Sequence, residues 1–466
     1  MYIAWAVILT VVLSMFGSVL YMQLNPDVTE TTDEGMSLDA VQVNMAGKIY
    51  VGQSILAGDE GKSVSGNLSE LNTGPLDQRY AYTVLVNEFK GPEDALEELA
   101  EIDNAVEEHE YEPTENEIRI RELVGGLLEQ YESGDLDSSY MSTDDQEFIK
   151  TELGWLGELL LYPAESPNEV DRKELTDQAF MSMIVLAISF GVMFLVFLAG
   201  LAAIAFVLYL ISSNKLVPEF DPVSHNGVVY IETFAIWLVM FFGLQYGIVF
   251  ALDWIPAAIV GFLIPAIFFL SLLVLAWPVI RGVPFGTVLK DIGWEMKNPF
   301  VEMFYGAVAY MASMPALAAG LILSIMVINL MSLAETQAEF ASSGAGHPIV
   351  EQFSDGNSQT ILIAFLTACI AAPIVEETMF RGVLYRHLRE LSDAKRRGAS
   401  VIFSAIVNGL IFAAIHPQGL AGVPVLAAIA ICMTLAREWR SSLVASMTMH
   451  AIHNTLATGL LLMMFS

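Results

Sequence analysis

Long uncharged apolar stretches recur along this chain of 466 residues, and they constrain its fold more than any other feature. A helix needs about 20 apolar residues to cross a bilayer, and shorter stretches reach that length when polar positions facing a bundle are included. Residues 1–22 form the first stretch. Eight others follow, at 179–211, 234–252, 255–280, 303–333, 361–375, 399–415, 420–436 and 441–465. The pattern predicts an all-α, polytopic membrane helix bundle with about nine transmembrane helices.

Charge divides the chain into two different parts. Residues 23–178 contain 37 Asp and Glu against 9 Lys and Arg, whereas the other residues contain 16 against 12. Apolar residues recur at helical spacing between these acids, which predicts a helical extramembrane domain. Because a segment this acidic would repel the phosphates of DNA or RNA, nucleic acid is excluded as a partner. Cys369 and Cys432 both lie in apolar stretches, which excludes a disulfide framework and a cysteine-based zinc site.

We therefore predict four parts along the chain. They are an N-terminal membrane anchor at 1–22, an inserted acidic helical domain at 23–178, a transmembrane helix with a cytoplasmic linker at 179–229, and a helix bundle at 230–466. A cleaved signal peptide is the alternative for the first part. The absence of a basic segment and of a small-residue cleavage site favours an uncleaved anchor. In either case the acidic domain is exported.

Basic residues are distributed unequally between alternate loops, which predicts an orientation. One set of loops carries eleven of them, and the opposite short loops, near Asp253, over 334–359 and over 417–419, carry none. Cytoplasmic loops are enriched in Lys and Arg, so the N-terminus is expected in the cytoplasm and residues 23–178 outside it. The eleven are Lys215, Arg281, Lys290, Lys297, Arg386, Arg389, Lys395, Arg396, Arg397, Arg437 and Arg440.

Two adjacent acids and an arginine interrupt an apolar helix at Glu376, Glu377 and Arg381. Ionisable groups within a membrane are costly, about 3 kcal/mol each on insertion scales, so they indicate a functional site. Glu377 and Arg381 are one turn apart and can form an ion pair, whereas Glu376 points about 100° away and remains available as a general base. The alternative is that the three side chains only make structural contacts between helices, but such contacts rarely need two adjacent acids.

Imidazole and carboxamide side chains follow on the later apolar stretches, at His416, His450 and Asn454. His450 and Asn454 are four residues apart, so they face the same way and present two N–H donors. Two neighbouring donors are what a developing oxyanion requires. The alternatives are a single satisfied histidine at His416 and ordinary interhelical hydrogen bonds at the other two, worth about 0.6 kcal/mol each.

No His-Glu-x-x-His motif occurs, so the familiar single-helix zinc site is absent. Glu376, His416 and His450 from three helices could still bind zinc with one open coordination position. The residues alone therefore leave both a metal-free and a zinc-dependent site open, and no cofactor is certain.

These residues, in this order, resemble the motifs of the CAAX protease and bacteriocin-processing (CPBP) family of intramembrane proteases. The motifs are Glu376-Glu377-x-x-x-Arg381, Phe412-x-x-x-His416 and His450-x-x-x-Asn454, and the resemblance covers about residues 230–466. Three weak motifs in order on successive apolar helices make a specific signal.

The resemblance implies an intramembrane endopeptidase that is either glutamate- or metal-dependent. Glu376 and His416 would activate water, His450 and Asn454 would stabilise the oxyanion, and Glu377 with Arg381 would hold the first helix in register. The resemblance also implies that the substrate is a membrane-associated peptide or protein. The chain would then be an integral protein of the bacterial inner membrane, with the lipid bilayer as its other partner. A non-catalytic scaffold or a bacteriocin-immunity-type binding protein that uses the same cavity is the alternative function.

One spacing conflicts with a shared site. Counted from Arg386 and Ala399 at the ends of the basic loop, Glu376 lies about 15 Å deep and His416 about 25 Å deep at 1.5 Å per residue. Helix tilt, or a second helix that begins in the cytoplasm, has to close that gap before the two side chains can bind one water.

Overall fold

The protein is described here from a computed structural model, which covers the chain except residues 25–37, 58–67, 70, 139–140, 165, 216–218, 221–227, 252–253, 256, 295–297, 335–357, 393–396 and 466. Within the described residues every regular element is a helix, which confirms the predicted all-α class. These residues form two compact units. The membrane unit lies within residues 1–24, 193–333 and 347–460, and the acidic unit lies mainly within residues 25–192.

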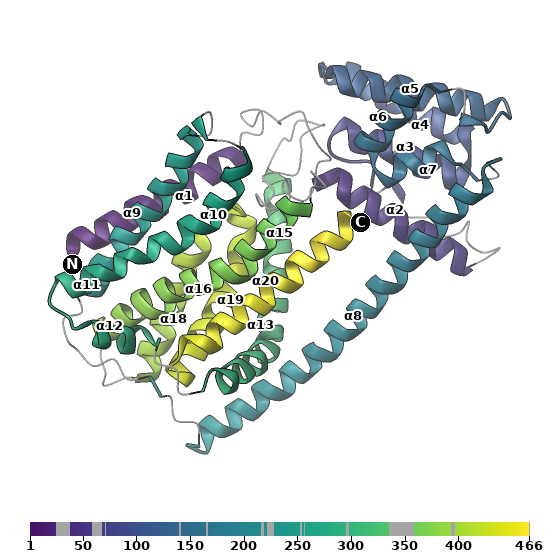
Figure 1. The fold of residues 1–466 in the computed structure, drawn as a ribbon. Helices are drawn as coiled ribbons and strands as arrows, with labels where there is room; N and C mark the ends of the chain where they lie inside the picture. Colours follow the sequence, from purple (N-terminus) through teal and green to yellow (C-terminus); the bar gives the residue numbers. More distant parts are fainter. Residues whose placement is uncertain are drawn as a thin grey trace. The chain divides into compact units, whose positions relative to one another are not determined.

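The acidic unit is a small helical domain (Figure 1). It has its own apolar core. Leu85, Val124 and Leu156 are completely buried in that core. Sharp turns separate its helices: Gly91 between α3 and α4 takes φ 106°, which an L-residue rarely adopts. Its helices are α2 (Leu38–Ala57), α3 (Leu76–Lys90), α4 (Pro92–Glu108), α5 (Glu115–Glu132), α6 (Thr143–Leu153), α7 (Trp155–Leu161) and the first part of α8 (Glu169–Ser212).

The membrane unit contains the long apolar helices (Figure 1). Eight described helices are long and apolar enough to cross a membrane. The ninth predicted crossing is α20, which has 23 residues but carries two histidines and an asparagine. The helices are α1 (Tyr2–Leu24), the rest of α8, α9 (Val228–Ala251), α10 (Ala257–Ser271), α11 (Ala276–Ile280), α12 (Phe285–Ile292), α13 (Pro299–Ala334), α15 to α17 (Ser358–Leu391), α18 (Arg397–Ala414), α19 (Gly419–Arg440) and α20 (Leu443–Phe465).

An aromatic cluster packs α9 and α18 against the helix that carries the two acids. Phe380 lies 5.2 Å from Phe234, 5.7 Å from Trp237 and 5.1 Å from Phe412, between ring centroids, and each contact is edge-to-face. All four rings are buried. Such geometry adds about 0.5–1.5 kcal/mol per pair to the burial itself. The cluster therefore fixes the height of the acids relative to α18.

Glycines let α13 approach α19 and α20 closely. A Cβ at Gly306 would lie 2.6 Å from the backbone oxygen of Ala445 on α20, and one at Gly320 would lie 2.9 Å from Cα of Val425 on α19. Small residues are typical of such contacts within membranes, because the backbones themselves provide the packing. α13 thus closes one side of the bundle around the last two helices.

The placement of Arg386 and Arg389 in a basic loop is wrong. Both lie in α17 (Tyr385–Leu391) and are 2% and 5% exposed. Arg389 Nε lies 3.1 Å from Glu438 Oε2, and Arg386 Nη2 lies 3.4 Å from Asp291 Oδ2. Because buried charges persist only when they are paired, these acids explain why the helix extends past the arginines.

Candidate active site

The two acids lie at the end of one short α-helical segment within a longer continuous helix. This segment, α16 (Ala372–Glu377), is preceded by the π-helical segment η6 (Thr367–Ala371) and followed by another, η7 (Thr378–Leu384). α15 (Ser358–Leu366) precedes η6. Single π-turns inside α-helices are rare and are found frequently at functional sites, because they change the direction of the side chains that follow.

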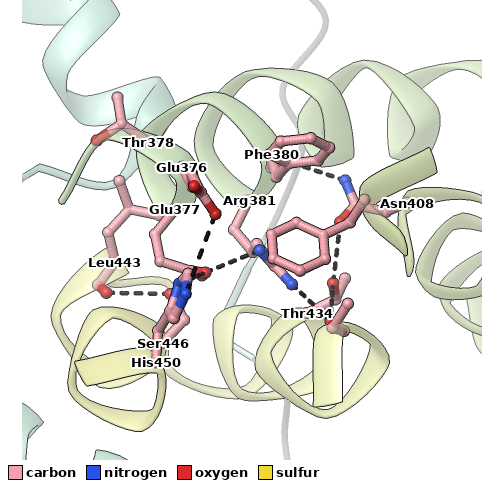
Figure 2. Close-up of polar contacts among 12 residues, drawn as sticks. Glu376, Glu377, Thr378, Phe380, Arg381, Asn408, Thr434, Leu443, Ser446 and His450 are labelled. Atoms are coloured by element: carbon pink, nitrogen blue, oxygen red, sulfur yellow. Dashed lines mark hydrogen bonds and ion pairs between the residues drawn. The ribbon is translucent and has the colours of Figure 1, made fainter. Parts of the chain in front are cut away.

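Glu377 and Arg381 form the ion pair expected from their one-turn spacing (Figure 2). Arg381 Nη1 donates to Glu377 Oε1 at 2.7 Å, and both side chains are completely buried. Arg381 Nη2 donates to the Ala430 oxygen of α19 at 3.0 Å, and its guanidinium lies 4.6 Å from the centre of the Phe412 ring. The arginine therefore connects three helices while it neutralises the buried carboxylate.

His450 lies between the two carboxylates. Its Nδ1 is 3.0 Å from Glu377 Oε1, and its Nε2 is 4.0 Å from Glu376 Oε2 (Figure 2). Since Glu377 is the partner of Arg381, its oxygen accepts the hydrogen from Nδ1. That bond leaves Nε2 directed toward Glu376.

His416 approaches the same oxygen of Glu376 from the end of α18. The distance from its Nε2 to Glu376 Oε2 is 3.9 Å. Its Nδ1 lies 2.6 Å from the Phe412 oxygen, a bond in which the imidazole is the donor because a carbonyl can only accept. In the neutral ring Nε2 is then an acceptor. Glu376 Oε2 is itself buried and has no hydrogen-bond partner among the described residues.

The structure brings Glu376 and His416 together, with His416 Nε2 3.9 Å from Glu376 Oε2, and it reduces their difference in depth from about 10 Å to about 6 Å. α17 continues to Leu391, so Glu376 lies 15 residues, about 22 Å, from the end of its helix. His416 lies 19 residues, about 28 Å, beyond the start of α18 at Arg397. The estimate from the sequence placed the end of the first helix too early, because the buried arginines were counted as loop residues.

Asn454 and His450 do not present their amide and ring hydrogens to a common acceptor. Asn454 Nδ2 donates to the Ala368 oxygen in η6 at 2.7 Å, whereas His450 Nδ1 bonds to Glu377. These two bonds use one hydrogen of each side chain, so the pairing of His450 and Asn454 as donors to one oxyanion stays a prediction. A primary amide has two hydrogens, so one hydrogen of Asn454 is not used by this bond.

Two other polar groups beside the site were not identified as site residues from the sequence. Tyr310 of α13 places its hydroxyl oxygen 3.4 Å from His453 Nδ1. Asn408 of α18 is completely buried and donates to the Phe380 oxygen at 2.8 Å. Each is a polar residue within an apolar helix, which is the signal that could have identified it.

A metal ion does not fit these residues as they are placed. No three His, Cys, Asp or Glu side chains in the described part of the chain converge closely enough to hold one. Two ligands of one tetrahedral zinc lie roughly 3.4 Å apart, since zinc–nitrogen and zinc–oxygen bonds are about 2.0–2.1 Å long. The separations of 3.9 and 4.0 Å between the imidazoles and Glu376 are longer, and they match a water molecule hydrogen-bonded to each.

The last helices of the membrane unit match a known protease family. Residues 358–456 match the family model described as type II CAAX prenyl endopeptidase Rce1-like, which is about a fifth of the chain. The chain matches no curated protein and no solved structure. The matched range extends from the start of α15 into α20 and includes every predicted site residue. This range is therefore similar to a CAAX endopeptidase family, and the predicted CPBP resemblance is confirmed for residues 358–456.

Proposed function

We propose that this protein is an intramembrane endopeptidase that hydrolyses peptide bonds of membrane-associated proteins, with Glu376 as the general base. The observation that carries the proposal is that one buried carboxylate oxygen, Glu376 Oε2, faces the Nε2 atoms of His416 and His450 at 3.9 and 4.0 Å. The family match supports the reaction class. The Glu376 carboxylate and the two imidazoles are too far apart for direct hydrogen bonds, and a water molecule between them could bond to each.

In the proposed reaction, Glu376 and His416 activate the water. Both present acceptors, so the water donates one hydrogen to each and turns a lone pair toward the substrate carbonyl. The water oxygen bonds to the carbonyl carbon while its proton passes to Glu376. The protonated Glu376 then transfers this proton to the departing amine as the C–N bond breaks. The acid ends in the state in which it started.

His450 and Asn454 are the proposed partners of the oxyanion. His450 is held at Nδ1 by Glu377, so protonation of its Nε2 would give a donor directed at the reacting carbonyl. The second amide hydrogen of Asn454 would be the other donor. Glu377 and Arg381 act through His450, since their ion pair fixes the carboxylate oxygen that orients the ring.

Comparative proteomics of membrane fractions tests this function directly. Cells producing the wild-type protein should contain cleaved membrane proteins that are absent when Glu376→Gln replaces it. Glu232→Gln is the matched control, because Glu232 lies in α9 and contacts Trp277 and Arg281 instead of the site. If all three strains have the same cleavage products while the wild-type protein still binds peptides, the non-catalytic scaffold or immunity-type function is supported instead.

We also propose an orientation with the N-terminus in the cytoplasm and residues 23–178 outside it. Cysteine labelling of intact cells should modify Glu93→Cys and not Lys395→Cys, because Lys and Arg gather at one set of alternate helix ends and connections, and cytoplasmic ends are enriched in these residues. Lys395 lies outside the described residues. The wild-type protein, with Cys369 and Cys432 only, is the blank. Labelling of both positions, or the reverse pattern, contradicts this topology.

Activity without a bound metal ion is expected at this site. Elemental analysis of the purified, active protein should find no zinc, and chelators should leave cleavage unchanged. The physical reason is that an imidazole bound to zinc through Nε2 cannot also donate a hydrogen bond from that atom. One equivalent of zinc together with reversible loss of cleavage on chelation would instead make Glu376, His416 and His450 metal ligands.

A further inference from the structure

Two π-helical segments flank the catalytic acids, and each changes the backbone bonding of the helix. In η6 the Ala372 amide donates to the Thr367 oxygen, and in η7 the Tyr385 amide donates to the Phe380 oxygen. Both bonds join residues five apart instead of four. A helix in this register has carbonyl groups without their usual backbone donors, and buried carbonyls need another donor.

The missing donor at the first segment has an identifiable cause. The Ala372 amide is already used by Thr367, and the next residue, Pro373, has no N–H. The Ala368 oxygen therefore receives no hydrogen from either of these two positions. Asn454 of α20 supplies one from its side chain at 2.7 Å.

The second segment also receives a side-chain hydrogen bond from another helix, although its Phe380 oxygen already accepts the Tyr385 amide, so this bond is a second one to the same oxygen. Asn408 of α18, completely buried, donates from Nδ2 to the Phe380 oxygen at 2.8 Å (Figure 2). Its Oδ1 lies 3.2 Å from Thr434 Oγ1 of α19, which also lies 2.7 Å from the Ala430 oxygen. Thr434 has one hydroxyl hydrogen, which it donates either to Asn408 Oδ1 or to the Ala430 oxygen, so the carboxamide contacts η7 through its nitrogen and α19 through its oxygen.

These contacts converge on the arginine of the site. Phe380 immediately precedes Arg381, and the Ala430 oxygen that Thr434 contacts is also the acceptor of Arg381 Nη2. The backbone at Phe380 is therefore held by Asn408, while the guanidinium next to it is held by α19. A shift of η7 into the α-helical register would rotate Arg381 relative to Glu377.

We propose that Asn408 is a positioning residue for the protease: it holds η7 in its π-helical register and thereby places the Glu377–Arg381 pair that orients His450. This inference rests on the proposed function, because it assigns a role in cleavage to a side chain that touches neither water nor substrate. Asn454 has the corresponding position at η6, so the short helix α16 is held at both ends by carboxamides from other helices.

The test compares cleavage of one fluorogenic peptide, selected with the full-length wild-type protein in lipid nanodiscs, among matched variants. Asn408→Leu keeps the size of the side chain and removes its donor. It should lower kcat by about 10²-fold, as small misplacements of catalytic groups do, with KM nearly unchanged. Ser404→Ala, also completely buried and one turn earlier on α18, is the control and should keep the wild-type kcat.

A double-variant comparison separates positioning from general stability. In the background Glu377→Gln with Arg381→Met there is no ion pair to place, so adding Asn408→Leu should cost less than about twofold. The same 10²-fold loss in both backgrounds would overturn the positioning role. If Asn408→Leu does not accumulate, Thr434→Val replaces it, since it removes the hydroxyl that orients the carboxamide; an unchanged kcat there would also overturn the role.

Hydrogen exchange separates failure of this inference from failure of the proposed function. Amides of the peptide covering residues 378–391 should exchange faster in Asn408→Leu than in the wild-type protein and in Ser404→Ala. Unchanged exchange overturns the inference even if the enzyme is active. A wild-type protein that cleaves nothing overturns the proposed function, and with it the catalytic role of Asn408.

Discussion

Glu376→Gln is expected to lower turnover by about 10²–10⁴-fold, the range typical for loss of a general base. Glutamine preserves the size of the side chain and can still bond to a water, but it cannot take the proton that the attacking water loses. The measurement is kcat for the peptide used above, with the full-length protein in nanodiscs. Because Glu376 Oε2 has no hydrogen-bond partner among the described residues, no bond within the protein is lost.

The variant should therefore fold as the wild-type protein does. Its membrane accumulation and melting temperature should stay close to wild-type values, and peptide affinity should be unchanged. Glu232→Gln serves again as the control for a Glu-to-Gln change in an apolar helix of the membrane unit. Near-wild-type turnover by Glu376→Gln, with intact protein, would show that another group is the base.

Much of the site follows from the sequence because helical geometry converts spacing into direction. The four-residue interval between Glu377 and Arg381 is sufficient to predict their ion pair, since positions one turn apart face the same side. The cost of charge inside a membrane singles out the same residues. The apolar stretches likewise predict the helices, because a bilayer allows few other structures.

The remaining features depend on contacts between distant residues. The two π-helical segments arise where Pro373 removes a donor and where Asn408 adds one, and the second residue is 28 positions away from the carbonyl it binds. Asn454 has the right spacing to accompany His450, yet its amide bonds to Ala368. Spacing within one helix cannot show which acceptor a neighbouring helix provides.

The buried arginines likewise show that the sequence near a charged residue does not reveal its partner on another helix. Arg386 and Arg389 look like loop residues when only the neighbouring sequence is considered. Their acidic partners, Asp291 and Glu438, lie on α12 and α19. Since a paired buried charge costs far less than an unpaired one, the end of a membrane helix depends on partners elsewhere in the chain. Misplacing this end produced part of the apparent difference in depth between Glu376 and His416.

Glu377→Gln should behave differently from Glu376→Gln and affect stability first. Arg381 is completely buried, and Glu377 is its carboxylate partner at 2.7 Å. Removing one partner of a buried ion pair leaves the other charge uncompensated, at a cost of about 3–5 kcal/mol. The expected result is a lower melting temperature in detergent or poor accumulation in the membrane, and activity is lost as a consequence.

The double variant Glu377→Gln with Arg381→Met tests this physical reason. Methionine removes the uncompensated charge and keeps an apolar side chain against Phe412, so part of the protein level and melting temperature should return. Cleavage should recover less than stability, because His450 still lacks the ionised carboxylate that orients it. Melting temperature and cleavage rate are measured together for the wild-type protein, the two single Glu variants and this double variant. If Glu376→Gln proves unstable while Glu377→Gln folds normally and is inactive, the two acids have exchanged roles, and Glu377 is the base.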